Sequence, residues 1–340
     1  MVYLDKYLAE VNKLPDFCRR YFDAKQDKFT ASTKYVYAVD LKIFFEWMAA
    51  KLDKDRAMDI TLADLDELTE DDINSYLSYL NKYEYEGKVY TNTEAGKARK
   101  ITTLRSFFKY FKRRELIKQN VMELIDIPKI KEKAIVVLSP NEQKDIFDVA
   151  ETGSNKSDRA KQFHEKTVKR NMAILTLFLG TGIRVSELVN INDEDVDFKE
   201  QRILIIRKGG DKQFVYFGNE VSAALLEYME EERATLMGYK NVNDIPMNSP
   251  LFVSLKHQRI TTRMVENIIK DIAKAVVPSS VKITPHTLRK TYGTMLYYRY
   301  KDIYLTQKAL GHTTPQTTIK YYTKFNEEQL KQLKDYEPNN

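Results

Sequence analysis

Pro285-His286-Thr287-Leu288-Arg289-Lys290 and Leu310-Gly311-His312, followed by Tyr321-Tyr322, bring chemically active side chains together near the C-terminus. A third stretch, Gly180-Thr181-Gly182-Ile183-Arg184, lies far upstream. Arginine stays charged and can donate two parallel hydrogen bonds to phosphate oxygens. Tyrosine can act as a covalent nucleophile. Two arginines, two histidines and a tyrosine are what an enzyme would need to bind a phosphodiester and attack it.

Length and composition limit the class of protein. The chain has 340 residues, 43% of them hydrophobic and 31% charged, which predicts about two domains with buried cores. No stretch approaches the roughly 20 apolar residues that span a bilayer, and the first residues lack the pattern of a signal peptide. A single cysteine, Cys18, and four scattered histidines argue against disulfides and a zinc site. We therefore expect a cytoplasmic protein without a metal, a cofactor or a membrane partner.

Basic residues are concentrated between residues 97 and 118, although the whole chain has a net charge of only +6. A basic stripe on one element is the electrostatic footprint of a protein that binds the phosphate backbone of DNA. A solvated charged face is equally normal on a bundle helix, so both interpretations stay open. The DNA-contacting residues expected under the first are Lys97, Arg99, Lys100, Arg105, Lys109, Lys112 and Arg113.

The first third of the chain has helical periodicity. Apolar residues recur on one face over 33–50, where Ser32 can cap the start, and again over 93–118. Between them, Thr69 and Asp72 have the spacing of a capping box. Pro128 and the alternating charges after it indicate a linker, and Ser139-Pro140-Asn141-Glu142 marks the next helix start. We predict a helical domain over 1–126, a linker over 127–137, a second domain over 138–325 and a tail over 326–340.

The second domain has a mixed pattern. Residues 202–207 and 213–217 are β-type runs joined by a glycine-rich turn, which predicts a hairpin. Residues 251–255 are predicted as a further short strand. Helices are predicted over 168–180, 220–237, 261–276, 285–300, 305–310, 317–323 and 326–336. The fold class is therefore mainly α with a small antiparallel β-sheet.

Metal-free cleavage of a DNA strand has three chemical requirements. A nucleophile must attack phosphorus, fixed positive charge must stabilise the non-bridging oxygens, and the leaving 5′ oxygen needs a proton. A fixed donor aimed at developing charge supplies about 3–4 kcal/mol. Tyrosine has a free pKa of about 10, so a neighbouring base or cation must assist it. Each candidate alone also fits a structural role, such as a cap or an ion pair, and only their joint occurrence at these spacings favours chemistry.

The joint pattern resembles the tyrosine recombinase family, also called the phage integrase family, and most of all its Xer-type members. Thr181–Leu188 resembles the box with the family's first catalytic arginine, and Thr317–Tyr321 resembles the stretch that ends in the nucleophile. Lys208 lies in a hairpin turn where the family places its catalytic lysine. The resemblance implies that the catalytic residues are Arg184, Lys208, His286, Arg289, His312 and Tyr321, with Glu187 in support.

The resemblance also implies an activity. Tyr321 attacks the scissile phosphate of a specific duplex DNA site and forms a 3′-phosphotyrosine link, while Arg184 and Arg289 bind its oxygens. A helical core-binding domain and a mixed α/β catalytic domain close around the DNA, and a homotetramer exchanges the strands of two sites. The phosphotyrosine keeps the bond energy, so no ATP is needed. The helix over 326–336 docks on a neighbouring protomer or packs on its own domain.

Several alternatives stay open at this point. Lys290 replaces a frequent family histidine, and Tyr322 competes with Tyr321 for the role of nucleophile. A type IB topoisomerase that relaxes DNA and a non-catalytic DNA-binding relative are the rival functions. Residues 1–28 are too few for an arm-binding domain, which favours an Xer-like architecture. Chromosome-dimer resolution and mobile-element integration use the same parts, and the sequence does not reveal the target site.

Overall fold

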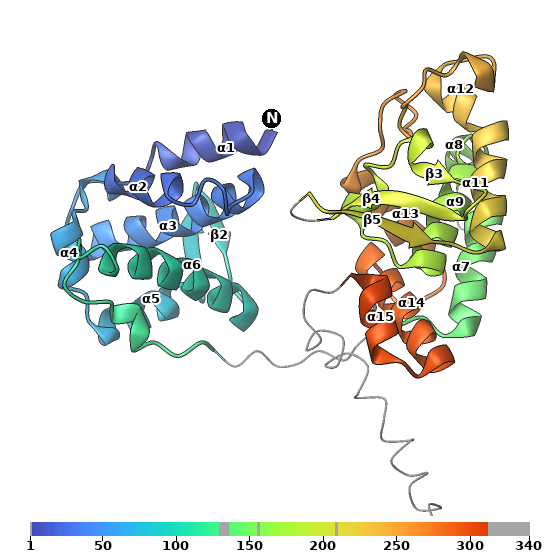
Figure 1. Cartoon of the computed structure of the whole chain (residues 1–340). Coiled ribbons are helices and arrows are strands. Elements are labelled where there is room, and N and C mark those ends of the chain that lie inside the picture. The colour runs from blue at the N-terminus through green and yellow to red at the C-terminus, as the bar shows by residue number, and fades with distance from the viewer. Residues whose placement is uncertain (1, 129–135, 155–156, 208–209, 312–340) are drawn as a thin grey trace, which may run out of the picture. The chain divides into compact units, whose positions relative to one another are not determined.

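The computed structural model describes residues 2–128, 136–154, 157–207 and 210–311 (Figure 1). The chain divides into two compact units, Met1–Lys133 and Ala134–Asn340. The division falls inside the stretch 127–137, which the sequence predicts as a linker.

The N-terminal unit is a helical bundle with a short β-hairpin. Its elements are α1 (Val2–Val11), α2 (Phe17–Asp23), α3 (Ala31–Lys51), α4 (Leu62–Asp66), α5 (Glu70–Tyr79), β1 (Tyr83–Tyr85), β2 (Lys88–Tyr90) and α6 (Glu94–Lys112), with 3₁₀ turns at Ala57–Asp59 and Val121–Glu123. Aromatic rings fill the space between the two longest helices, α3 and α6. Phe44 and Phe45 of α3 meet Phe107 and Phe108 of α6, and all four are fully buried. Aromatic pairs of this kind add about 0.5–1.5 kcal/mol beyond the burial of their area.

Local hydrogen bonds determine where the helices begin. Thr69 with Asp72, and Ser139 with Glu142, form the capping boxes that their spacing predicts. The prediction of Ser32 as a cap is wrong. The Thr30 hydroxyl accepts from the backbone N–H of Thr33 at 3.2 Å instead, so α3 begins two residues earlier than expected.

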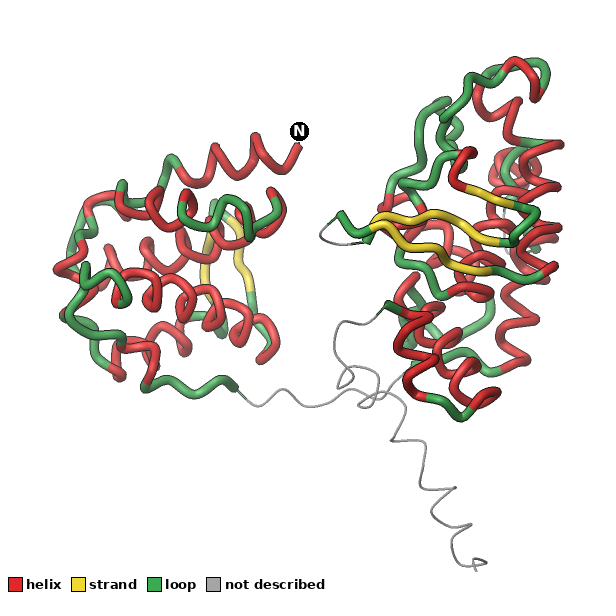
Figure 2. The backbone as a smooth tube through the Cα atoms, in the orientation of Figure 1, coloured by secondary structure: helices red, strands yellow, loops and turns green. Residues whose placement is uncertain are grey.

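The C-terminal unit combines helices with a three-stranded antiparallel sheet, ordered β3-β4-β5 (Figure 2). Its elements are α7 (Pro140–Thr152), α8 (Asp158–Glu165), α9 (Val168–Thr181), α10 (Val185–Leu188), β3 (Val196–Asp197), β4 (Arg202–Ile206), β5 (Lys212–Tyr216), α11 (Asn219–Glu231), α12 (Arg233–Met237), α13 (Thr262–Ala273), α14 (Pro285–Tyr300) and α15 (Ile303–Leu310), with 3₁₀ turns at Asp193–Asp195 and Val242–Asp244. Helix α9 packs against α11 and α14 and carries much of the core. The predicted fold class, mainly α with a small antiparallel sheet, is confirmed.

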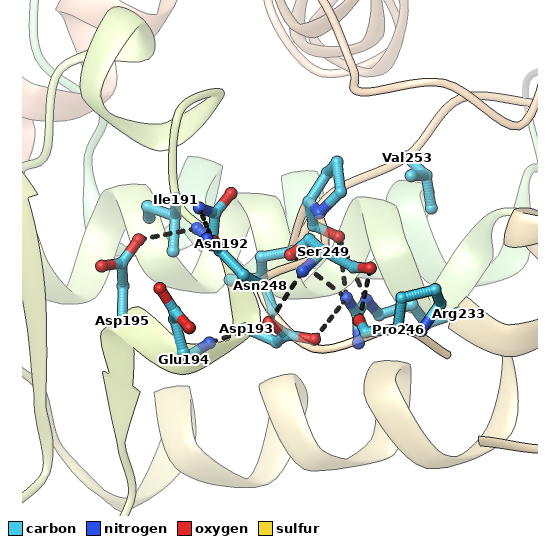
Figure 3. Close-up of polar contacts among 12 residues, drawn as sticks. Ile191, Asn192, Asp193, Glu194, Asp195, Arg233, Pro246, Asn248, Ser249 and Val253 are labelled. Atoms are coloured by element: carbon cyan, nitrogen blue, oxygen red, sulfur yellow. Dashed lines mark hydrogen bonds and ion pairs between the residues drawn. The ribbon is translucent and has the colours of Figure 1, made fainter. Parts of the chain in front are cut away.

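Two predictions for this unit are wrong. The helix expected over 220–237 breaks at Glu232, because its buried carboxylate accepts hydrogen bonds from the backbone N–H groups of Lys169 and Arg170 at the start of α9. The strand expected over 251–255 forms only one isolated bridge, between Val253 and Arg259. A side chain binds the backbone next to this segment. Arg233 donates to Asp193 at 3.0 Å (Figure 3). It also donates to the carbonyl of Pro250 at 3.0 Å.

A buried ionic cluster joins α3 to α6. Asp40 is 1% exposed, and its carboxylate accepts from Arg99, from Lys100 at 3.3 Å and from Thr103 at 3.0 Å. Lys100 is itself buried, and this burial lowers the pKa of its ammonium. Lys100 therefore stabilises the bundle, and its burial does not favour the DNA contact predicted for it. None of the described helices is both long enough and apolar enough to cross a membrane.

We expect Asp40→Ala to destabilise the N-terminal unit by about 3–5 kcal/mol, because it leaves the Lys100 ammonium buried without its counter-charge. Urea unfolding measured by the fluorescence of Trp47, the chain's single tryptophan, reports on this unit. The exposed Asp55 provides the matched control, and Asp55→Ala should change stability by less than about 0.5 kcal/mol. Equal effects of the two substitutions would contradict a structural role for the cluster.

Candidate active site

Arg184 is held where α9 gives way to α10. Gly182 has a left-handed φ of +62°, and a Cβ there would lie 2.4 Å from Cδ1 of Tyr292, so only glycine fits this turn. The backbone N–H of Arg184 donates to Oε2 of Glu187 at 2.9 Å, and its Nη1 donates to Oε1 at 2.8 Å. The Arg184 side chain remains 37% exposed, so a ligand can reach its guanidinium.

Arg289 approaches the same turn from α14. Thr284 caps this helix and Pro285 occupies its first turn, which fixes the register of the residues that follow. Arg289 is 4% exposed, and its guanidinium donates to the carbonyls of Gly182 and Leu310. Arg184 and Arg289, 105 positions apart in the sequence, are therefore brought to one place by a single glycine turn.

The carbonyl end of α15 is the meeting point of these side chains. The Leu310 carbonyl accepts from Arg289, and the Gly311 carbonyl accepts from Nη2 of Arg184 at 3.1 Å. Free carbonyls at a helix C-terminus carry partial negative charge, which stabilises cations. The end of α15 thus holds both arginines directly before position 312.

Arg207 is a site residue that the sequence motifs did not reveal. It follows β4, and its Nη1 donates to Oε1 of Glu187 at 3.3 Å and to the Leu310 carbonyl at 3.0 Å. Strand alternation could have found it: Ile203 and Ile205 are buried, so the next position of the same parity continues the inward face. The hairpin motif pointed to the adjacent Lys208 instead.

The site carries more positive than negative charge. The guanidinium groups of Arg184 and Arg207 share the carboxylate of Glu187, and the guanidinium of Arg289 donates to the Leu310 carbonyl that Arg207 also contacts. The Glu187 side chain is only 3% exposed, so its charge is weakly screened by water. The surplus of positive charge suits an anionic ligand such as a phosphodiester.

His286 lies at the start of α14, one turn before Arg289, with its side chain still open to solvent. Partial desolvation lowers the pKa of its imidazole from the ordinary 6.5, and the positive charges of Lys290, Arg289 and Arg184 lower it further. The imidazole is therefore neutral at pH 7 and can accept a proton.

The remaining predicted catalytic residues lie outside the described part of the chain. These are Lys208, His312 and Tyr321, together with the rival Tyr322 and the tail over 326–340. In the sequence, Lys208 directly follows Arg207 and His312 directly follows Gly311. Their places in the site stay predictions.

Comparison with known proteins decides the family. The model of the phage integrase family matches residues 137–329, more than half of the chain. The chain belongs to the phage integrase family. It is therefore a tyrosine recombinase, an enzyme of site-specific DNA strand exchange. The family match does not favour the two rival functions, relaxation of DNA and a non-catalytic role.

Individual relatives agree with this assignment. A tyrosine recombinase XerC of Caldanaerobacter subterraneus subsp. tengcongensis is 30% identical over 315 residues, which cover 90% of this chain and 82% of the relative. A XerC of Thermodesulfovibrio yellowstonii is 36% identical over 224 residues, covering 66% and 69%. Among solved structures, the XerH recombinase bound to its difH substrate has a TM-score of 0.65 at 20% identity, covering 89% and 79%. The Tn1549 transposon integrase in complex with DNA has a TM-score of 0.60 at 20% identity, covering 90% and 94%. The solved structures confirm the fold.

The N-terminal unit of this recombinase contains a basic cleft of about 460 Å³ at the end of α6, which we call the α6 cleft. It is lined by Ala24, Lys25, Lys28, Tyr110, Arg113 and Arg114. The guanidinium of Arg114 lies 3.9 Å over the ring of Tyr110. Partial desolvation and the neighbouring cations lower the pKa of Lys25. The lining residues include no carboxylate, so the α6 cleft can accept an anion.

The structure separates the predicted DNA-contacting residues into two groups. Lys97 pairs with Glu94, Arg99 with Asp40, and Arg105 with the carbonyl of Ile125. These contacts hold the fold together, although they do not preclude contact with DNA. Lys109, Lys112 and Arg113 are exposed near the end of α6. Arg113 lines the α6 cleft and the charge of Lys109 acts on Lys25 there, whereas Lys112 donates to the carbonyl of Lys118. This second group presents the stronger phosphate-binding surface.

The lowered pKa of His286 predicts a pH profile. If the neutral imidazole accepts a proton during cleavage, the rate should fall as pH falls through a midpoint below 6.5. Lys290→Gln removes a positive charge and should move this midpoint upward. The measurement is single-turnover formation of the protein–DNA adduct at subsaturating DNA, which reports the ionisation of the free enzyme.

Lys282→Gln, which removes an exposed lysine from the same unit, provides the matched control and should leave the midpoint unchanged. An acid limb that stays in place in Lys290→Gln would refute this assignment of the titrating group. A limb that persists in His286→Gln would refute it as well.

Proposed function

We propose that this recombinase cuts and rejoins duplex DNA at a specific site through a 3′-phosphotyrosine on Tyr321. The observation that carries the proposal is the convergence of Arg184 and Arg289 on the carbonyls of Leu310 and Gly311. Their contacts with the end of one helix support the proposal that both guanidinium groups bind one phosphate. The same contacts put them directly before the chain segment that contains both His312 and Tyr321.

In the proposed cleavage step, the Tyr321 oxygen attacks phosphorus while its proton passes to the neutral imidazole of His286. Arg184 and Arg289 stabilise the negative charge that grows on the non-bridging oxygens. His312 donates a further hydrogen bond to these oxygens. The bond to the 5′ oxygen breaks, and Lys208 supplies the proton to that leaving group. The reverse reaction, with the 5′-hydroxyl of a partner strand as nucleophile, rejoins the DNA.

The proposed DNA-binding surface combines the α6 cleft with the exposed basic residues of α6. Its support is that the residues lining the cleft include four cations and no carboxylate. Partial burial lowers the pKa of Lys25, and the charges of Lys28, Arg113 and Arg114 lower it further. A DNA phosphate would relieve this repulsion. Because backbone contacts carry no sequence information directly, the surface positions DNA and the target sequence is read elsewhere.

The proposed assembly is a homotetramer on two DNA sites, with the tail over 326–340 docking on a neighbouring protomer. Two biological roles remain candidates, chromosome-dimer resolution and mobile-element integration or excision. The names of the relatives called XerC favour an Xer-type enzyme, while the Tn1549 integrase shares the fold. Candidate sites for both roles come from the DNA that flanks the gene.

Substitution of Tyr321 tests the nucleophile. A nicked suicide substrate lets the cleaved fragment diffuse away, so a covalent adduct accumulates and can be resolved on a denaturing gel. We expect Tyr321→Phe to abolish the adduct and Tyr322→Phe to retain it. Phenylalanine lacks the hydroxyl oxygen that attacks phosphorus, so it cannot act as the nucleophile.

Loss of the adduct only in Tyr322→Phe would reassign the nucleophile. Absence of an adduct from the unsubstituted protein on every flanking site and on random-sequence duplexes would refute the proposed function. Peptide mapping of the adduct identifies the modified tyrosine independently of the substitutions.

Charge removal tests the α6 cleft. We expect Lys25→Gln and Arg114→Gln each to weaken DNA binding by a similar factor for target and unrelated duplexes. Each should also reduce the slope of log K against log salt by about 0.9, the value for one lost phosphate contact. Arg56→Gln is the control, since Arg56 is exposed in the same unit and pairs with Asp59. An unchanged salt slope in both cleft variants would exclude the cleft from the DNA interface.

A further inference from the structure

Arg207 is a buried cation with an unusual set of partners. Its side chain is 9% exposed, and its guanidinium donates to Glu187 at 3.3 Å, to the Leu310 carbonyl at 3.0 Å and to Gln213 at 2.9 Å. Burial lowers its pKa, while the charge of Glu187 opposes this shift. A cation in this position is stable only as long as these partners stay in place.

Two of these partners are shared with the arginines proposed to bind the scissile phosphate. Oε1 of Glu187 accepts from Arg184 at 2.8 Å as well as from Arg207. The Leu310 carbonyl accepts from Arg289 as well as from Arg207. The contacts therefore run without interruption from Arg184 through Glu187, Arg207 and Leu310 to Arg289.

The backbone on both sides of Arg207 is shaped to hold this guanidinium. Its N–H donates to the carbonyl of Asp211 at 2.8 Å, which closes the base of the β4–β5 hairpin. Gly311 has a φ of +59°, and a Cβ there would lie 2.4 Å from Cζ of Arg207. The absence of a side chain at Gly311 lets the guanidinium lie directly against the end of α15.

We propose that Arg207 is a positioning residue that sets the spacing and charge of the Arg184–Arg289 pair. The proposal rests on the proposed function, in which that pair binds the phosphate. Because Arg207 and Arg184 share the carboxylate of Glu187, this carboxylate does not fully neutralise Arg184. The guanidinium of Arg184 therefore stays available to the substrate. Arg207 also fixes the Leu310 carbonyl that holds Arg289.

Replacement of Arg207 should release both constraints. Glu187 then pairs with Arg184 alone, and the end of α15 loses a contact that fixes its position. A displacement of about 1 Å at a reacting centre lowers a rate about 10²-fold. We expect a loss of that order in adduct formation for Arg207→Gln. Arg207→Lys should lose nearly as much, because an ammonium keeps the charge but lacks the planar fork that reaches separate partners.

A change in the substrate separates positioning from a general structural role. The suicide substrate is prepared with an ordinary scissile phosphate and with a methylphosphonate, in which an uncharged methyl group replaces one non-bridging oxygen. The second substrate needs less positive charge from the protein. The Arg207 defect should therefore shrink at least 10-fold on the methylphosphonate, as the defects of Arg184→Gln and Arg289→Gln should.

Arg202→Gln is the matched control. Arg202 begins the strand that Arg207 follows and pairs with Asp197 at 3.1 Å, but it has no described contact with the site. It should cleave both substrates at the unsubstituted rate. Thermal unfolding of each variant shows whether it is folded.

Three results would overturn the proposal. They are an Arg207 defect of equal size on both substrates, no defect at all, and rescue only by a substrate with sulfur at the 5′ bridging position. Rescue by sulfur would assign Arg207 to the leaving-group proton, because a thiolate departs without one. An unsubstituted protein without an adduct would refute the proposed function instead.

In that case, ¹⁵N guanidinium signals of the DNA-free protein still test the positioning role. We expect the signals of Arg184 and Arg289 to move in Arg207→Gln and to stay in place in Arg202→Gln. Unmoved signals in Arg207→Gln would overturn the proposal without reference to activity.

Discussion

The carbonyl end of α15 holds the guanidinium groups of Arg184, Arg207 and Arg289 in one small volume. Two like charges about 4 Å apart repel by about 4 kcal/mol at the effective dielectric near a protein surface. Carbonyl dipoles and the carboxylate of Glu187 offset this repulsion without supplying equal negative charge. A phosphodiester can neutralise the remaining positive potential. The surplus charge of the site is therefore the property that its proposed function uses.

The hydrophobic core keeps these polar contacts in register. Helix α9 carries fully buried Ile174, Leu177 and Phe178, and α14 packs against it through Leu288. Arg184 lies just after the turn that ends α9, and Arg289 directly follows Leu288 on α14. A slip of either helix would move a guanidinium by more than a hydrogen-bond length. The apolar packing therefore sets the geometry of the site, and Gly182 and Gly311 allow the close approach.

The sequence predicted those features whose stabilising interactions join residues close together in the chain. The capping boxes at Thr69 and Ser139 span three residues, and both were predicted. Arg184, Glu187, His286 and Arg289 could be proposed as site residues because their motifs are short and ordered. The Glu232 break was missed because its carboxylate bonds to backbone about 60 residues earlier. The partner of Lys100 was missed for the same reason, since Asp40 lies on another helix and nothing near Lys100 in the sequence indicates it.

The presence or absence of counter-charge, rather than charge alone, is the basis on which we propose DNA-binding residues in this chain. Lys42 lies among Glu10, Glu46 and Glu86, and the buried Lys100 pairs with Asp40, which Arg99 also contacts. These lysines stabilise the bundle and offer little to a phosphate. The lining of the α6 cleft has cations without carboxylates, and the arginines of the active site outnumber the described carboxylate that they share. Both places keep positive charge that the fold itself does not neutralise, and that property distinguishes a binding surface from an ordinary charged one.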